Sequence, residues 1–350
     1  MFAADTKVVP VPMTDAYNSE PVSSWKQIVG SVEPFLEAVE RRLAQQVDAF
    51  DPALADYAEY ALNGQGKHLR PALVALTAKA LGELGEGHVT AAVIVELVHL
   101  ATLVHDDVMD EAEIRRGRLT LAANWGNELA VLFGDCLFAH ALKLAAGFPT
   151  PDVCRTVSAA TNTVCAGEIL QTQHEHDFQL TRETYFKVLE MKTAELFALS
   201  CELSAFLSGI GLECREAMRQ FGLAYGTAYQ VYDDCVDLFG TEAAAGKSLG
   251  TDLAKGKFTL PVLLLWERAS LADRALLEKL VRGWQPGSMK QVTELMMKYE
   301  TPSASLEAVY HYLEKAREVT RLLPASEGRA SLAALTDFLA AQADTLEVCA

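Results

Sequence analysis

Two short stretches of the sequence carry the same pattern of aspartates, DDxxD. The first comprises Asp106, Asp107 and Asp110, and the second comprises Asp233, Asp234 and Asp237. Residues four apart share one face of a helix, so each copy pairs two carboxylates directly after a long apolar stretch. Two like charges at the edge of an apolar core are costly unless a cation joins them. Acids on a solvated helix end would explain one copy, but two copies at the same spacing favour a metal site.

The chemistry of these ligands indicates which metal and which substrate. Oxygen ligands alone select Mg²⁺ or Mn²⁺ rather than zinc, and Mg²⁺ keeps room for water and phosphate oxygens. Two facing clusters would therefore hold a diphosphate through bridging Mg²⁺. Basic residues near both copies agree, because Arg binds phosphate in a bidentate manner and Lys binds it as a point charge. They are Lys67, Arg70, Arg115, Arg116, Lys192, Lys247 and Lys257.

The elements that must position these residues are helices. No proline occurs between Pro71 and Pro149 or between Pro151 and Pro261, which favours long helices. Alternating patterns typical of strands are essentially missing. Apolar residues recur at helical spacing in Ala91–Val108, Leu129–Ala145, Val153–Gln173, Arg182–Ser208 and Cys214–Phe239. We therefore expect a single all-α domain of about ten or more helices over residues 25–350, after a disordered or loosely packed lead over residues 1–24.

These motifs resemble the trans-isoprenyl diphosphate synthases, also called polyprenyl synthetases, and in particular their long-chain, octaprenyl-type subgroup. The matching stretches follow the order of the family: GKHLRP (66–71), HLATLVHDDVMDEAEIRRG (99–117), GEILQ (167–171), KTAELF (192–197), AYQVYDDCVD (228–237) and GKSLGTDLAKGKFTLP (246–261). The resemblance implies the all-helical isoprenoid synthase fold around a deep central cavity, and a homodimer. Gln65 and His68 stand where the family often has Gly and Arg.

The resemblance also implies a reaction and a role for each residue. An allylic prenyl diphosphate would condense head to tail with isopentenyl diphosphate, and about three Mg²⁺ ions would bind to Asp106, Asp110 and Asp233. Asp107, Asp234 and Asp237 would support them. The allylic diphosphate would contact Arg115, Lys192, Thr193, Gln230, Lys247 and Lys257, with Lys192 also catalytic. Isopentenyl diphosphate would contact Lys67, Arg70, His99 and Arg116.

Two small residues before the first cluster bear on the length of the product. Ala101 and Thr102 precede Asp106 by five and four residues, where relatives that make short products carry bulky aromatics. We expect a long product, roughly C30–C50, with a floor formed by Phe133, Leu137 or Phe138. The alternative is a short-chain synthase that makes farnesyl or geranylgeranyl diphosphate, roughly C15–C20. A terpene cyclase and a catalytic subunit of a heteromeric synthase are further alternatives.

Composition excludes several other classes of protein. The formal charge of −17, from 30 Lys+Arg against 47 Asp+Glu, argues against nucleic acid as a partner, because phosphate binding needs a basic face. No uncharged apolar run reaches about 18 residues, so we expect no membrane span. The seven cysteines form no CxxC pair, which fits a reducing compartment. The first residues lack an apolar signal region, and we expect a cytoplasmic protein.

Overall fold

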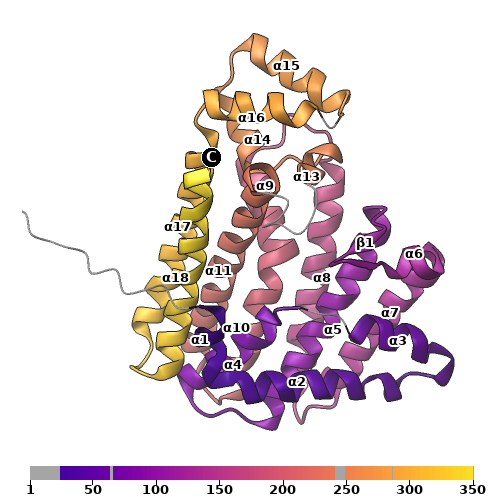
Figure 1. Cartoon of the computed structure of the whole chain (residues 1–350). Coiled ribbons are helices and arrows are strands. Elements are labelled where there is room, and N and C mark those ends of the chain that lie inside the picture. Colours follow the sequence, from indigo (N-terminus) through magenta and orange to yellow (C-terminus); the bar gives the residue numbers. More distant parts are fainter. Residues whose placement is uncertain (1–23, 64–65, 241–248, 286, 350) are drawn as a thin grey trace, which may run out of the picture.

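The computed structural model describes residues 24–63, 66–240, 249–285 and 287–349, and helices make up nearly all of its regular structure (Figure 1). The first half contains α1 (Trp25–Val29), α2 (Glu33–Gln45), α3 (Ala55–Leu62), α4 (Leu69–Leu81), α5 (Glu86–Met109), α6 (Leu121–Trp125), α7 (Asn127–Ala146) and α8 (Asp152–Gln173). The second half contains α9 (Arg182–Leu189), α10 (Glu195–Leu207), α11 (Leu212–Phe239), α13 (Thr251–Ala254), α14 (Leu260–Arg268), α15 (Leu271–Arg282), α16 (Ser288–Lys298), α17 (Thr301–Leu322) and α18 (Glu327–Cys349). Short 3₁₀ turns are η1 (Gly30–Val32), η2 (Val47–Ala49) and η3 (Pro52–Leu54). The all-α prediction is confirmed, while Lys247 and residues 1–23 lie outside the described residues.

Helix α5, which ends in the first aspartate cluster, lies at the centre of the bundle. It packs against α4, α7 and α10, and α11 packs against α10 and α17. One hydrophobic cluster runs through all of these helices. Figure 1 shows α2 running across one end of the bundle and α15 and α16 projecting at the other end. Both aspartate clusters therefore sit on helices held by the main core.

Two described helices, α5 and α7, are long and apolar enough to cross a membrane by length and composition alone. Their most apolar windows have mean hydropathy 1.7 and 1.6, and 67% and 39% of these windows are buried inside the protein. The apolar composition of α5 is explained by its place in the core. Helix α7 instead leaves apolar side chains uncovered, including Leu132, which is 65% exposed.

A small β hairpin interrupts the helical pattern directly after the first cluster. Strands β1 (Ile114–Arg115) and β2 (Arg118–Leu119) pair antiparallel, and Arg116 in the turn has a φ of 52°. The hydroxyl of Tyr60 on α3 donates to the backbone carbonyl of Leu119 at 2.6 Å, and the Arg118 guanidinium lies 4.3 Å from the Tyr60 ring centroid. Helix α3 thus holds the hairpin in place. The sequence analysis predicted no strands and missed this hairpin.

The helix expected over residues 182–208 contains a π-helical segment, η4 (Glu190–Ala194), between α9 and α10. Such segments are rare and occur often at functional sites. Two glycines from different helices pack against the π-helical segment: Gly167 on α8 and Gly226 on α11. A Cβ on Gly167 would lie 2.7 Å from the Lys192 backbone nitrogen, and one on Gly226 would lie 2.7 Å from the Ala194 Cα. Only glycine at these positions lets the three helices approach this closely.

Candidate active site

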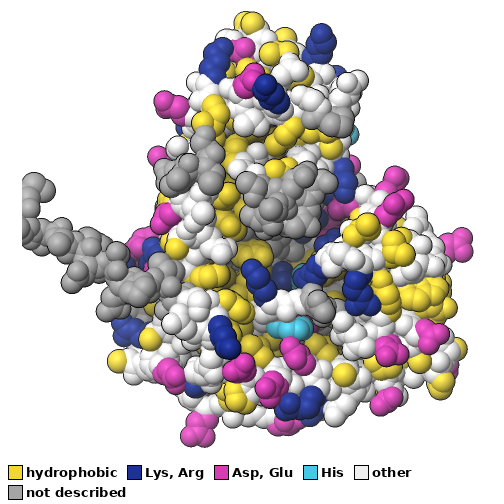
Figure 2. Space-filling view, viewed as in Figure 1, with side chains coloured by type: hydrophobic (Ala, Val, Ile, Leu, Met, Phe, Trp, Pro, Cys, Tyr) yellow, Lys and Arg dark blue, Asp and Glu magenta, His cyan; other side chains and the backbone are white. Residues whose placement is uncertain are grey.

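Two cavities meet at the ends of α5 and α11. The larger has a volume of about 1080 Å³ and the smaller about 150 Å³, and Lys192, Thr193, Gln230 and Asp233 line both. Figure 2 shows Lys and Arg side chains gathered around the middle of the face on which the bundle is hollowed. The shared residues make the π-helical segment and α11 the common wall of the two cavities.

The first aspartate cluster divides its carboxylates between the cavities. Asp106 lines the larger cavity and Asp110 the smaller one. Burial raises the pKa of Asp106 to about 6, with Lys192 opposing the rise and Glu168 and Asp110 adding to it. Burial would also raise the pKa of Asp110, but hydrogen bonding and attraction to Lys257 outweigh it and lower that pKa. The carboxylate of Asp106 is therefore held in a site that a cation would stabilise.

Asp107, the remaining member of the first cluster, lines neither cavity. It is buried and accepts a hydrogen bond from Nε of Arg115 at 2.7 Å. This bond ties the end of α5 to the β hairpin. Asp107 thus supports the cluster by positioning Arg115, which lines the larger cavity.

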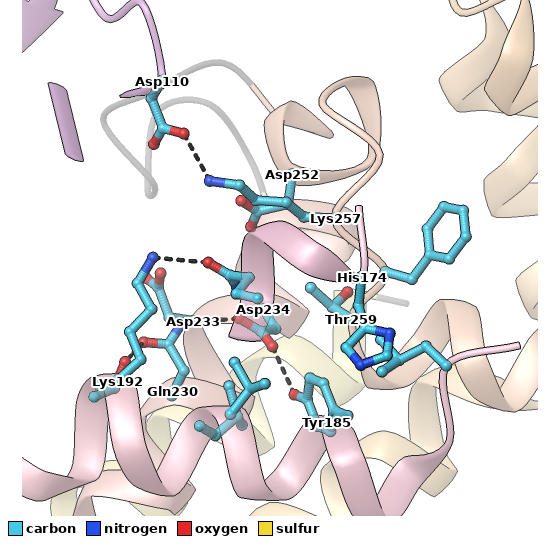
Figure 3. Close-up of a pocket in the computed structure, with 16 residues that line it drawn as sticks. Asp110, His174, Tyr185, Lys192, Gln230, Asp233, Asp234, Asp252, Lys257 and Thr259 are labelled. Carbon is cyan, nitrogen blue, oxygen red and sulfur yellow. Dashed lines mark hydrogen bonds and ion pairs between the residues drawn. The ribbon is translucent and has the colours of Figure 1, made fainter. Parts of the chain in front are cut away.

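The second cluster also separates into distinct environments. Asp233 lines both cavities. The buried Asp234 accepts hydrogen bonds from the Tyr185 hydroxyl at 2.6 Å and from Nε2 of Gln230 at 2.8 Å, and burial raises its pKa well above the usual value. Figure 3 shows Tyr185 and Gln230 reaching this aspartate. Asp234 therefore has the surroundings of a neutral hydrogen-bonded group rather than those of a free carboxylate.

Asp237 connects the second cluster to the segment that carries the last lysines. It is fully buried and accepts a hydrogen bond from Oγ1 of Thr251 at 2.9 Å and a weaker one from the Asp252 backbone nitrogen at 3.3 Å. These bonds hold the start of α13 against the end of α11. The chain that follows places Nζ of Lys257 2.6 Å from Oδ1 of Asp110, across the smaller cavity (Figure 3).

The π-helical segment directs two consecutive side chains into the cavities. Lys192 forms an ion pair with Glu168 and donates to Oε1 of Gln171 at 2.8 Å. Thr193 donates to Oε1 of Gln230 at 3.0 Å. These adjacent residues of the π-helical segment thus line both cavities.

The far side of the larger cavity is cationic. It is lined by Lys67, Arg70, His99, Arg115 and Arg116. The guanidinium of Arg70 lies 4.6 Å from the Phe197 ring centroid, which holds it in place. Burial, together with Arg70 and Arg116, keeps the pKa of His99 well below its usual 6.5, so this histidine is neutral. An anion bound at this wall would therefore contact Lys and Arg side chains directly, without a metal ion held by the aspartates.

The two residues expected to limit chain length are placed differently. Thr102 lines the larger cavity together with Leu103, Phe138 and Val164. Ala101 is fully buried in the core and does not line the cavity, since it lies on another face of α5. Of the three residues expected to form a floor, Phe138 lines the cavity, whereas Phe133 and Leu137 are buried behind it.

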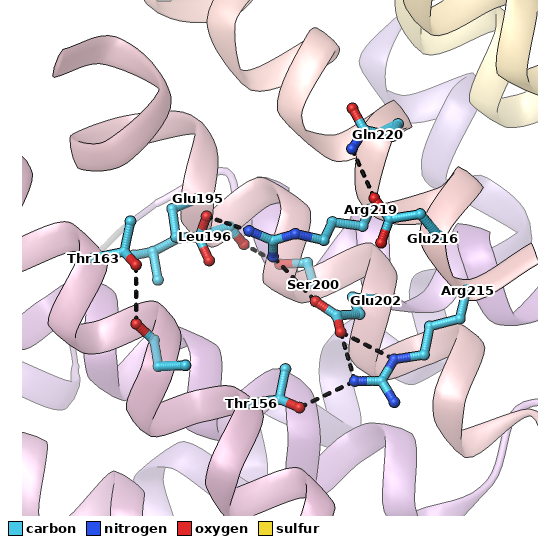
Figure 4. A network of polar contacts seen from close by, with 11 residues as sticks. Thr156, Thr163, Glu195, Leu196, Ser200, Glu202, Arg215, Glu216, Arg219 and Gln220 are labelled. Carbon is cyan, nitrogen blue, oxygen red and sulfur yellow. Dashed lines mark hydrogen bonds and ion pairs between the residues drawn. The ribbon is translucent and has the colours of Figure 1, made fainter. Parts of the chain in front are cut away.

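A polar network joins α8, α10 and α11 next to the π-helical segment (Figure 4). Arg219 on α11 bridges two acids of α10, Glu195 at 2.7 Å and Glu202 at 3.0 Å. Arg215 binds Glu202 as well and reaches Oγ1 of Thr156 on α8 at 3.1 Å. Since Glu195 directly follows the π-helical segment, the network locks the three helices that surround it.

Several residues of the site received no role from sequence reasoning. Glu168 and Gln171 lay in a recognised motif, GEILQ, which could have drawn attention to them. Lys255 lies 3.4 Å from Asp110, and Asp252 lines the smaller cavity. Tyr185 gave no signal at all, because its role arises only when α9 packs beside α11.

The donor set fits Mg²⁺ that is completed by a substrate. Among the described residues no three Asp, Glu, His or Cys side chains converge as a metal cage. Asp106 lines the larger cavity, Asp110 the smaller one and Asp233 both, and Mg²⁺ characteristically takes one or two carboxylates together with phosphate oxygens. Burial raises the pKa of Asp106 to about 6, so its ionised carboxylate is costly without a cation beside it.

An all-helical cavity with carboxylates at one side and fixed cations at the other is the architecture of an isoprenoid synthase. Comparison with known proteins agrees. The sequence profile of the family described as polyprenyl synthetase matches residues 51–299. The chain therefore belongs to the polyprenyl synthetase family, and it is a trans-prenyltransferase of the polyprenyl diphosphate synthase type.

The similarity to individual relatives extends over most of the chain. An octaprenyl diphosphate synthase of Haemophilus influenzae is 32% identical over 305 residues, which span 87% of this chain and 92% of that protein. Heptaprenyl diphosphate synthase component 2 of Bacillus subtilis is 34% identical over 309 residues, 87% of each chain. A polyprenyl synthase from Caulobacter crescentus, solved with calcium and isoprenyl diphosphate, superposes with a TM-score of 0.86 at 31% identity, covering 92% of this chain and 98% of that one. Names of other relatives range from short-chain isoprenyl to nonaprenyl diphosphate synthase.

Proposed function

We propose that the chain condenses isopentenyl diphosphate head to tail with an allylic prenyl diphosphate and produces an all-trans polyprenyl diphosphate of roughly C30–C50. The observation that carries this proposal is that two adjoining cavities present two anion sites of different kind. Carboxylates and lysines from α5, α11 and the α13 segment surround one site, and the cations near Arg70 surround the other. Apolar residues of α5, α7 and α8 extend the cavity beyond them.

The allylic diphosphate is assigned to the carboxylate side. Asp106, Asp110 and Asp233 would hold Mg²⁺, which neutralises the charge that develops on the diphosphate as a leaving group. Lys192 and Lys257 lie in the same walls and stabilise that charge directly. Lys247, assigned to this substrate by the family pattern, lies outside the described residues.

Isopentenyl diphosphate is assigned to Lys67, Arg70, Arg116 and the neutral His99. With both diphosphates bound, the C1–O bond of the allylic substrate breaks and the double bond of isopentenyl diphosphate forms the new C–C bond. The released diphosphate keeps the electrons of the C1–O bond and accepts the proton that leaves C2 of the former isopentenyl unit. The apolar lining near Leu103 and Phe138 excludes water from the allylic cation.

Incubation of the purified chain with labelled isopentenyl diphosphate and farnesyl diphosphate, with and without Mg²⁺, tests the reaction. We expect incorporation only with the metal. Chromatography of the products tests the chain length, and a product that stops at C20, one condensation beyond the C15 primer, would establish the short-chain alternative. Thr102→Phe should shorten the product because Thr102 lines the cavity, whereas Ala101→Phe would overpack the core and act mainly on stability.

We propose further that the active form is a homodimer joined through the uncovered face of α7 and α8. Leu132 and Ile169 are 65% and 61% exposed, and Val131 is 40% exposed. Val131 and Ile169 also line the larger cavity, so a second copy on this face would close its side. Leu132→Glu should convert the dimer to a monomer in light scattering.

A cytoplasmic location stays a prediction.

A heteromeric enzyme is the second candidate, because the relative from Bacillus subtilis is named as one component of a synthase. The same incubation separates the two candidates. Incorporation by the isolated chain favours the homodimer, and its absence in a folded protein favours a catalytic subunit that needs a partner.

A further inference from the structure

His68 occupies an unusual position in the cationic wall of the larger cavity. It stands at the start of α4 between Lys67 and Arg70, with a φ of 44° and a ψ of 45°. A left-handed backbone is uncommon for a residue other than glycine and often marks a functional site. This conformation directs the imidazole across to two neighbouring helices rather than along its own.

The imidazole lies between two carboxylates. Its Nδ1 is 3.5 Å from Oε1 of Glu96 on α5, and its Nε2 is 3.6 Å from Oε1 of Glu40 on α2. The side chains of His68 and Glu96 are only 15% and 10% exposed, whereas Glu40 is 59% exposed. Both His68 and Glu96 line the cavity. A buried acid thus lies in the wall that is assigned to a diphosphate.

The charges that face His68 come from every element around it. The carboxylate of Glu96, 3.5 Å from Nδ1, raises the pKa of His68 above its usual 6.5, Glu40 adds to the rise, and burial and Arg116 on the hairpin oppose it. His99 on α5 is neutral, as described above. The pKa values of two histidines in one wall are therefore shifted in opposite directions.

We propose that protonated His68 is a positioning residue for isopentenyl diphosphate, because it pairs with Glu96 and Glu40 and keeps their negative charge away from the bound diphosphate. The proposal rests on the assignment of this wall to isopentenyl diphosphate. When His68 loses its proton, the two carboxylates are uncompensated and repel the substrate. Affinity for isopentenyl diphosphate then falls as the pH rises, whereas the allylic site is unaffected.

The test compares the wild type with His68→Arg, which keeps the positive charge at every pH. The KM for isopentenyl diphosphate is measured between pH 6 and pH 9 at saturating allylic substrate and Mg²⁺. Ionisation of the substrate affects both proteins equally, so it cancels in the ratio of their KM values. We expect the wild-type KM to match that of the variant at pH 6 and to exceed it about three- to tenfold at pH 9, the effect of one charge at several ångströms in a partly solvated site.

Two further variants separate charge from packing. His68→Gln should show the high KM at every pH with an unchanged kcat, and His68→Gln combined with Glu96→Gln should recover much of the affinity. In Glu40→Gln the KM should begin to rise at a lower pH than in the wild type, because one of the two acids that favour protonated His68 is gone. A pH-independent ratio between wild type and His68→Arg in an active enzyme would overturn the inference.

A binding measurement keeps this inference separate from the proposed reaction. The C2–H proton signal of His68, assigned by its loss in His68→Arg, is titrated in metal-free protein with and without inorganic diphosphate. Bound diphosphate should raise the pKa of His68, since linkage works in both directions. An unchanged titration would refute the role of His68 even if the enzyme is active, whereas a raised pKa without turnover would leave the role standing and refute the reaction.

Discussion

Replacement of Asp106 by asparagine should make the metal-free protein more stable while it abolishes turnover. Burial raises the pKa of Asp106 from 3.8 to about 6. An acid whose pKa rises on folding holds its proton more tightly in the folded state, so a penalty develops as the pH rises between these two values. At about 1.4 kcal/mol per pKa unit, ionised Asp106 costs the folded protein up to about 3 kcal/mol above pH 6. Asparagine has nearly the same shape and carries no charge.

The assay is urea unfolding in buffer with a chelator at pH 7.5 and again at pH 4.5. Asp106→Asn should be more stable than the wild type at pH 7.5, and the difference should shrink at pH 4.5, where the folded wild type is protonated. Asp110→Asn on the same helix is the matched control. This variant removes the negative partner of Lys257. Because the Lys257 side chain is only 11% exposed, its unpaired charge should destabilise the protein at pH 7.5. An Asp106→Asn variant no more stable than the wild type, or a gain that persists unchanged at pH 4.5, would refute the reasoning.

The other predictions concern groups that position the site. Gly167→Ala forces a methyl group against the π-helical backbone, and should cost about 1–3 kcal/mol in urea unfolding and raise the KM for the allylic substrate. Gly30→Ala, which meets nothing within 4 Å, is the control, and equal behaviour of the two would contradict the prediction. Arg219→Ala leaves the buried Glu195 without its partner and should cost about 3–5 kcal/mol, a loss that should be smaller for Arg219→Lys. Tyr60→Phe removes the hydroxyl that holds the β hairpin, and should raise the KM for isopentenyl diphosphate at constant kcat, with a stability loss of about 1 kcal/mol; an equal fall in kcat would argue against a positioning role.

The helical framework was open to prediction because its signals are local. Proline-free stretches with apolar residues at helical spacing became α5, α7, α8 and α11 within a few residues of the expected bounds. The β hairpin was missed because its strands are two residues long and are held by Tyr60 on a distant segment. The π-helical segment was missed because the contacts that permit it come from α8 and α11.

The site could be predicted as a set of residues but not as an arrangement. The spacing of the aspartates and the neighbouring cations pointed to a metal-bound diphosphate, since i and i+4 share a helix face whatever the rest of the chain does. Sequence reasoning could not tell that Asp237 would anchor α13 or that Ala101 would be buried away from the cavity wall. Both facts depend on which helix packs on which face.

The sequence alone therefore determined the helical class, the two aspartate clusters and the kind of ligand that they favour, because composition, periodicity and spacing act within one helix. The tertiary structure decided which neighbours each carboxylate meets. Asp106, Asp110, Asp233 and Asp234 line the cavities, and Lys257 pairs with Asp110. Asp107, Asp234 and Asp237 accept hydrogen bonds from Arg115, Tyr185 and Thr251. Identical motifs acquire different roles because burial and neighbouring charges, which set the free energy of each carboxylate, come from parts of the chain far away in sequence.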